Sequence, residues 1–269
     1  MTDLKTSAEV FHSLHQGPEL LVLPNAWDGG SARMMQSLGA KAIATTSSGV
    51  AWARGYCDGD QLPVEVLLET LRDINRAVDL PISVDAEGGY SESPRDAAQN
   101  ISRLMDAGAV GINIEDGFAS PDVLCVKIAA IRAVADRAGI DLFINARTDV
   151  FLKGLAPGGE VGEVCARARL YEDAGASGIF APGAVDADVI AALVKGVSLP
   201  LNIMARPGLP SHADMAKLGV RRLSAGGAIT QAAWGLSRRL AAGFLAGDTT
   251  ELYEGAATWG DLNDMMKQG

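Results

Sequence analysis

The sequence predicts an α/β fold, a (β/α)8 barrel of the TIM type that carries extra helices after its last strand. Short, continuously apolar runs alternate with helical patterns, which is typical of βαβ units and of a parallel sheet buried on both faces. A unit of helix, glycine and strand recurs, and polar residues follow the end of one apolar run after another. Eight such runs in 269 residues favour a closed barrel over an open, doubly wound sheet.

The elements of the barrel follow from these patterns in chain order. The apolar runs predict strands at 20–24, 41–46, 81–85, 110–114, 141–145, 177–181, 199–203 and 220–224. Helical spacing predicts helices at 63–78, 94–107, 123–138, 162–174 and 229–246, after an N-terminal amphipathic helix. Four strands are preceded by a glycine, at Gly39, Gly108, Gly175 and Gly219. A glycine at this place ends a helix in the left-handed conformation, so each supports a helix-to-strand boundary.

We expect a single barrel domain over residues 1–269, because no shift in composition marks a second one. A helical extension is predicted over 245–269, where Trp259, Leu262, Met265 and Met266 form an apolar stripe at helical spacing. One barrel leaves no obvious internal place for this stripe. We therefore expect it to contact another subunit, the alternative being that it packs on its own barrel.

Bulk composition narrows the classes of partner and compartment. The formal net charge is −10 and the chain has no basic stripe, so nucleic acid is not an expected partner. No apolar run reaches eighteen residues and no signal peptide is evident, so neither a membrane span nor export is expected. The three cysteines are far apart, which argues against a disulfide framework or a structural zinc site. We expect a cytoplasmic protein.

Carboxylates lie where several predicted strands end. Asp85 and Glu87 follow one strand, Glu115 follows the next, and Asp58 lies in the long loop after the second strand. The carboxyl ends of parallel barrel strands open on one face, so these groups are expected to converge. Hard oxygen ligands with few histidines suit Mg²⁺, or alternatively Mn²⁺. The alternative is that such acidic groups are solvated or cap the next helix.

Two further features of the same face suit an anion. Arg147 follows the fifth strand, and a guanidinium can hold a carboxylate or phosphonate with two parallel hydrogen bonds. The alternative is a structural ion pair of Arg147 with Asp149 or Glu115. Ser48 and Gly49 end a run of small residues whose backbone N–H groups could cradle an anion.

Motifs spread over nearly the whole chain resemble one known group, the isocitrate lyase / phosphoenolpyruvate mutase superfamily. They are 24–28 (Pro-Asn-Ala-Trp-Asp), 48–49, Asp58, 85–90 (Asp-Ala-Glu-Gly-Gly-Tyr), 114–116 and 145–149 (Asn-Ala-Arg-Thr-Asp). The resemblance implies a (β/α)8 barrel, commonly tetrameric, with the last helices swapped between subunits. It also implies Mg²⁺, a small 2-oxo or 2-hydroxy carboxylate, and C–C or C–P bonds made or broken through an enolate-like species.

The same resemblance implies a metal centre on the rim. Asp85 would be the main metal ligand, while Asp58, Glu87 and Glu115 would hold metal-bound waters. Glu87 stands where the family more usually has an aspartate.

The resemblance also implies a set of substrate contacts. Ser48 and Gly49 would bind the carboxylate and carbonyl end of the substrate, and Trp27 would also bind the substrate. Arg147 would bind the anionic group of the substrate, and Asn202 would be a further polar contact near the leaving fragment.

The chain departs from the family after its Glu115-Asp116 pair. The lyase branch has there a mobile loop with a catalytic cysteine, and the mutase branch has a longer gating loop; here residues 116–120 lead almost directly into a helix. We expect a Mg²⁺-dependent lyase or decarboxylase of a small 2-oxo or 2-hydroxy carboxylate, with Arg147, Asp58 and Glu115 as catalytic residues. The alternatives are C–P chemistry and a non-catalytic oxo-acid-binding protein. The substrate and the proton donor stay open.

Overall fold

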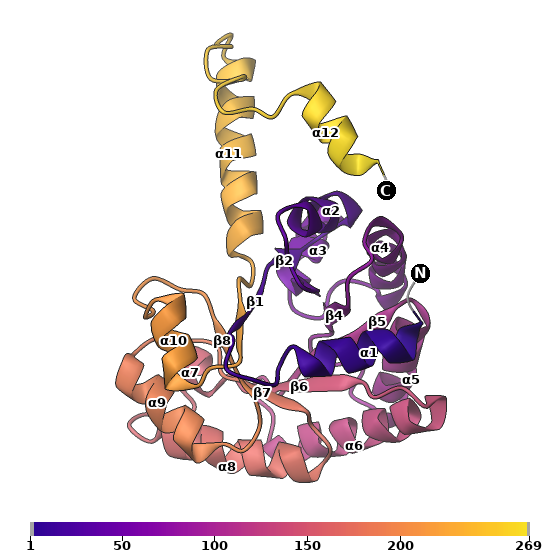
Figure 1. Ribbon diagram of the computed structural model, residues 1–269, viewed down its shortest axis with the longest axis vertical. Helices are drawn as coiled ribbons and strands as arrows, with labels where there is room; N and C mark the ends of the chain where they lie inside the picture. Colours follow the sequence, from indigo (N-terminus) through magenta and orange to yellow (C-terminus); the bar gives the residue numbers. More distant parts are fainter. Residues whose placement is uncertain (1–2, 268–269) are drawn as a thin grey trace.

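The computed structural model describes residues 3–267, in which nine parallel strands form one sheet that curls into a nearly closed barrel (Figure 1). The strand order is β1-β9-β8-β7-β6-β5-β4-β3-β2. The strands are β1 (Leu21–Leu23), β2 (Asn25–Ala26), β3 (Ile43–Thr45), β4 (Ile82–Asp85), β5 (Ala109–Glu115), β6 (Phe143–Arg147), β7 (Gly178–Phe180), β8 (Leu201–Met204) and β9 (Arg222–Ser224). The eight predicted strands are confirmed as β1 and β3 to β9, and β2 lies just outside the predicted range 20–24.

The first strand is divided at Pro24, which lies between β1 and β2. β1 pairs with β9 and β2 pairs with β3, so the two edges of the sheet are joined through this one residue. Proline has no backbone N–H to contribute to a strand ladder, which explains why the pairing partner changes here.

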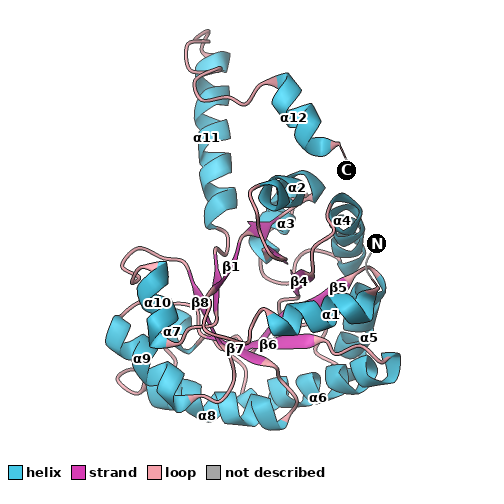
Figure 2. Ribbon diagram, viewed as in Figure 1, coloured by secondary structure: helices cyan, strands magenta, loops and turns pink. Residues whose placement is uncertain are grey.

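Helices surround the strands (Figure 2). They are α1 (Leu4–Ser13), α2 (Gly29–Ser37), α3 (Ser47–Ala53), α4 (Val64–Ala77), α5 (Pro94–Asp106), α6 (Pro121–Ala138), α7 (Val150–Lys153), α8 (Glu160–Asp173), α9 (Ala187–Gly196), α10 (His212–Leu218), α11 (Ala228–Leu245) and α12 (Trp259–Met266). The predicted helices are confirmed as α1, α4, α5, α6, α8 and α11. The predicted boundary glycines Gly39, Gly108, Gly175 and Gly219 all have positive φ, from 89° to 113°.

Helix α1 closes the amino-terminal end of the barrel. Phe11 on α1 is fully buried, and a Cβ placed on Gly111 of β5 would lie 2.6 Å from its ring, so only glycine fits there. His15, just after α1, stacks on Phe143 of β6 with ring centroids 3.9 Å apart. Its Nδ1 lies 2.8 Å from the carbonyl oxygen of Phe11. With this end plugged, the carboxyl ends of the strands form the open rim.

The barrel interior is polar below that rim. The Asn145 amide donates to Asn113 Oδ1 at 2.9 Å and to Asn202 Oδ1 at 3.2 Å. Arg222 on β9 donates across the barrel to Asn113 Oδ1 on β5 at 3.3 Å, and its side chain is 1% exposed. Burial lowers the pKa of Arg222 to about 9. The Arg222 Nε and Nη1 atoms have no partner among the described residues.

The last two helices leave the barrel. α11 projects away from it and α12 returns toward α2 (Figure 1). Arg33 on α2 donates from Nε to the carbonyl oxygen of Met265 at 2.9 Å. On α11 only Thr230 is buried, and several apolar side chains are exposed, namely Ile229, Trp234, Leu236, Phe244 and Leu245. Residues 268–269, the end of the predicted extension 245–269, and residues 1–2 lie outside the described residues.

No helix within residues 3–267 is both long enough and apolar enough to cross a membrane.

His15 makes the barrel floor sensitive to acid. Burial, and next the charge of Arg222, lower the pKa of His15 to about 3. The unfolded chain binds this proton near pH 6.5 and the folded chain does not, so stability falls as pH drops below about 6.5. Between pH 6.5 and pH 5 this group alone is expected to reduce the free energy of unfolding by about 2 kcal/mol. His15→Gln should lack this component in urea unfolding at the two pH values; an equal loss in the variant would contradict the assignment.

Candidate functional site

Three neighbouring strands deliver charged side chains to the open rim. Asp85 ends β4, Glu115 ends β5 and Arg147 ends β6, and the register places Glu115 directly opposite Arg147. Arg147 Nη1 lies 2.5 Å from Glu115 Oε2. Both residues also face the charge of Asp85. The convergence predicted from the strand ends is therefore present for these three residues.

One carboxylate oxygen of Asp85 is hydrogen-bonded and the other is not, within the part of the chain that the structure describes. Its backbone N–H donates to Thr45 Oγ1 at 2.8 Å, and its Oδ2 accepts from the backbone N–H of Ser47 at 3.2 Å. Its Oδ1 is buried and has no hydrogen-bond partner among the described residues. A buried carboxylate oxygen without a partner is unfavourable, and a directly bound cation would satisfy it.

Glu87 lies just beyond Asp85 and is 5% exposed. The hydroxyl of Tyr90 donates to Glu87 Oε1 at 3.0 Å, and the backbone N–H of Asp60 donates to Glu87 Oε2. Burial raises the pKa of Glu87 to about 7 although both hydrogen bonds oppose the shift. Burial and the neighbouring Glu87 carboxylate also raise the pKa of Tyr90.

Glu115, like Glu87, is a carboxylate with a raised pKa, and other carboxylates lie near it. Burial raises its pKa to about 8, and the carboxylates of Asp85 and Asp149 add to the shift while Arg147 opposes it. A divalent cation would offset the repulsion between these carboxylates. Within residues 3–267 no three His, Cys, Asp or Glu side chains already form a cage for a metal ion. Mg²⁺ commonly keeps several waters and binds through one or two carboxylates, so this donor set fits Mg²⁺ with Asp85 Oδ1 as the direct ligand.

Arg147 is held on two sides. Its Nε and Nη2 donate to the two carboxylate oxygens of Asp149 at 2.7 and 3.2 Å, and its Nη1 pairs with Glu115. Asp149 is fully buried and also pairs with Lys153 Nζ at 3.1 Å. Both structural ion pairs that the sequence left as alternatives are thus formed, and they fix the guanidinium in place at the rim.

Asp116, beside Glu115, ties the rim to the outer helices. Its Oδ2 accepts from Arg167 Nη1 at 2.8 Å and from the Tyr171 hydroxyl at 2.6 Å, both on α8. Residues 116–120 then lead into α6, as predicted from the sequence. In this short loop Phe118 is 79% exposed, and Lys153 Nζ lies 4.2 Å from its ring centroid.

Ser48 and Gly49 lie in the first turn of α3, next to the start of α11. A Cβ on Gly49 would lie 2.6 Å from Thr46 Cγ2, 2.7 Å from Thr230 Oγ1 and 3.1 Å from Trp27 Cβ. Close packing therefore requires glycine at this position. The Ser48 hydroxyl lies 3.1 Å from that of Thr46, and Ser48 itself is partly exposed.

Two predicted site residues lie apart from the others. Asp58 is exposed and its side chain makes no hydrogen bond within the described part of the chain; the residue that contacts Glu87 is Asp60, two positions later. Asn202 is fully buried in the barrel, where its amide donates to the carbonyl oxygen of Ile203 at 2.7 Å and to Ser224 Oγ at 3.2 Å. Sequence reasoning missed Asp60, because spacing alone cannot distinguish two acidic residues in one loop.

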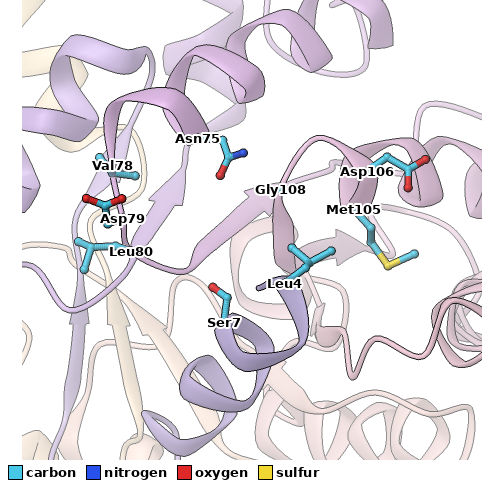
Figure 3. A pocket seen from close by; sticks show the side chains of 9 residues that line it. All are labelled: Leu4, Ser7, Asn75, Val78, Asp79, Leu80, Met105, Asp106 and Gly108. Carbon is cyan, nitrogen blue, oxygen red and sulfur yellow. The ribbon is translucent and has the colours of Figure 1, made fainter. Parts of the chain in front are cut away.

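Two hollows lie away from Arg147 and Glu115. One, of about 380 Å³, lies outside the Glu87 turn against Asp60, Glu92 and Lys127. The other, of about 370 Å³, lies at the amino-terminal end of the barrel between α1, α4 and α5 (Figure 3). Leu4, Asn75 and Asp106 are among its lining residues. Its position at the plugged end separates it from the charged rim.

Comparison with known proteins places the chain in a family. A family model described as phosphoenolpyruvate phosphomutase matches residues 11–245. An uncharacterised protein of Mycobacterium tuberculosis (strain ATCC 25618 / H37Rv) is 37% identical over 220 residues, 80% of this chain and 81% of the relative. A crystal structure of a Burkholderia cenocepacia J2315 protein, provisionally named a phosphonomutase, is 41% identical with a TM-score of 0.85, covering 89% of this chain and 98% of that one. An oxaloacetate decarboxylase of Bradyrhizobium sp. (strain BTAi1 / ATCC BAA-1182) is 28% identical over 227 residues, 80% of this chain and 76% of the relative.

The tight packing around Gly49 gives a stability test of this region. Gly49→Ala should destabilise the protein by about 1–3 kcal/mol, because the added methyl group would meet Thr46 and Thr230 at less than contact distance. Gly162→Ala on α8 is the matched control, since its Cβ would meet open space and alanine favours a helix. Urea unfolding of both variants measures the difference. Equal stabilities would show that α3 and the start of α11 are not packed this closely in the protein.

Proposed function

The chain belongs to the phosphoenolpyruvate phosphomutase family, a group of lyases and mutases, and from this premise we propose that it is a Mg²⁺-dependent decarboxylase of a small 2-oxo dicarboxylate. The observation that carries the proposal is the unpaired, buried Oδ1 of Asp85 beside the Glu115–Arg147 pair. The rim thus offers one free anionic ligand for a cation and one fixed guanidinium for an anion. A 2-oxo dicarboxylate has the complementary groups, a chelating end and a second carboxylate.

The residues of the rim divide the chemistry between them. Mg²⁺, when bound, supplies Lewis acidity toward the carboxylate and carbonyl oxygens of a 2-oxo acid. Asp85 would hold it directly, with Glu87 and Glu115 as partners of its water shell; Asp58, which is exposed and apart from them, is not included. Arg147, which Asp149 keeps oriented, would bind the second carboxylate.

Cleavage of the C–C bond releases CO₂ and leaves an enolate-like product that must take up a proton. Tyr90 is poorly suited to donate this proton, because its hydroxyl already donates to Glu87 and its pKa is raised. Tyr56 and Cys57 are exposed in the loop after α3. Cys125 on α6 and Cys165 on α8 lie in helices, and burial raises the pKa of both thiols. These positions favour water as the proton donor.

A second candidate function is C–P bond chemistry. Its support is the 41% identity to the Burkholderia cenocepacia protein provisionally named a phosphonomutase. Arg147 could hold a phosphonate as well as a carboxylate. The two functions differ in their products: decarboxylation releases CO₂, whereas C–P chemistry either releases inorganic phosphate by hydrolysis or moves the phosphoryl group within the substrate.

The reaction is tested with a panel of 2-oxo and 2-hydroxy acids in the presence of Mg²⁺. Oxaloacetate should yield pyruvate and CO₂ faster than in buffer with Mg²⁺ alone, and chelation of the metal should abolish the excess rate. Asp85→Asn keeps the shape of the side chain but removes its charge, so kcat/KM should fall by about 100-fold or more. Phosphate release from phosphonopyruvate, or its conversion to phosphoenolpyruvate, would establish the second candidate. Tight binding of these acids without turnover would indicate a non-catalytic oxo-acid-binding protein.

We also propose that the protein is a homo-oligomer, a dimer or tetramer, joined through α11 and the extension 245–269. The exposed Trp234 and Phe244 on α11 support this, since isolated apolar helices rarely stay uncovered. Sedimentation velocity should show an oligomer for the wild type and a smaller species for the double variant Trp234→Glu, Phe244→Asp. Arg238→Ala on the same helix serves as a polar control. A monomeric wild type would overturn the proposal.

A further inference from the structure

Two loops on the outer side of the rim contact each other at two places. The backbone N–H of Asp60, in the loop before α4, donates to Glu87 Oε2 in the turn after β4. The carboxylate of Asp60 lies against Gly88 of the same turn, where an added Cβ would be 3.1 Å from Asp60 Oδ2. The backbone and the side chain of Asp60 therefore both contact the Glu87 turn.

The backbone at this contact is unusual. Asp60, Glu87 and Tyr90 have φ values of 56°, 47° and 55°, and they are the only non-glycine residues with positive φ between residues 3 and 267. Side chains with a Cβ are disfavoured there, most of all one as bulky as tyrosine. All three residues meet at the Glu87 carboxylate, which accepts from the other two. Backbone strain of this kind persists where surrounding contacts enforce it, and it gathers at functional sites.

A buried lysine supports the same turn from outside. Lys127 on α6 is 6% exposed, and its Nζ donates to the carbonyl oxygen of Gly88 at 2.8 Å. Lys127, Asp60 and Glu92 line the hollow of about 380 Å³ on the outer side of the turn. Asp60 thus lies on the outer wall of the Glu87 turn, whereas Asp85 lies at the end of β4.

We propose that Asp60 is a positioning residue, which holds the Glu87 carboxylate in the orientation needed to meet the water shell of the cation at Asp85. This inference rests on the proposed function. A glutamate side chain has three rotatable bonds, and one hydrogen bond does not fix its carboxylate. Donors on both oxygens, from Tyr90 and Asp60, do fix it. The Asp60 carboxylate contributes by packing its own loop against Gly88.

The test is calorimetric titration of Mn²⁺ into the full-length protein and three variants. Asp60→Gly removes the carboxylate but adopts positive φ without strain. Asp60→Asn keeps a side chain of the same shape against Gly88 and removes the charge. Glu92→Gln is the matched control, because it removes a charge that faces Asp60 without touching Glu87. Thermal unfolding of each metal-free variant confirms that it is folded, and Asp60→Ala replaces Asp60→Gly if that variant does not fold.

The expected result distinguishes a positioning role of the Asp60 side chain from an effect of its negative charge. Asp60→Gly should bind Mn²⁺ about tenfold more weakly than Glu92→Gln, and Asp60→Asn should bind within about threefold of Glu92→Gln. Equal affinities of Asp60→Gly and Glu92→Gln would overturn the positioning role. An Asp60→Asn variant as weak as Asp60→Gly would overturn it too, since charge alone would then explain the loss. If the wild type itself bound no Mn²⁺, the proposed function would fail first, and the inference with it.

Discussion

The ion pairs of Arg147 are the interaction on which the charged rim depends. One guanidinium bonds with both oxygens of the fully buried Asp149 and with Glu115, at the meeting point of β5 and β6. Without it, three carboxylates would share a buried space with little to offset their repulsion, and the loops that carry them would separate. Asp149 is in turn fixed by its own N–H to Asp116, which links the rim to α8. The site is therefore connected to the outer layer of the barrel by continuous polar contacts.

The negative charge of the rim carboxylates is only partly balanced by Arg147. Glu87 and Glu115 have raised pKa values and Asp85 keeps a buried oxygen without a partner, although Arg147 is present. A site that is incomplete in this way is suited to a cation that arrives from solution. Because the barrel floor is plugged by Phe11 and His15, the cation and its substrate are expected to enter from the rim.

The sequence predicted the features that follow from hydrophobic periodicity and from the positions of the strand ends. Apolar runs located eight of the nine strands, and Asp85, Glu115 and Arg147 converge because parallel strands end on one face. It could not predict what depends on loop conformation or side-chain direction. Asp58 and Asp60 are equivalent by spacing, but only the positive φ of Asp60 brings its N–H to Glu87. Asn202 lies on a strand whose alternation gives no sign that its amide is committed to the barrel interior.

A crystal structure with Mn²⁺ and oxalate tests the central claim most directly, since oxalate carries two adjacent carboxylates like the chelating end of a 2-oxo acid. The anomalous signal of the metal gives its position directly. The account predicts one Mn²⁺ ion bonded to Asp85 Oδ1, with Glu87 and Glu115 reached through water. Metal bound at any other place, or bonded to the protein without Asp85, would contradict it.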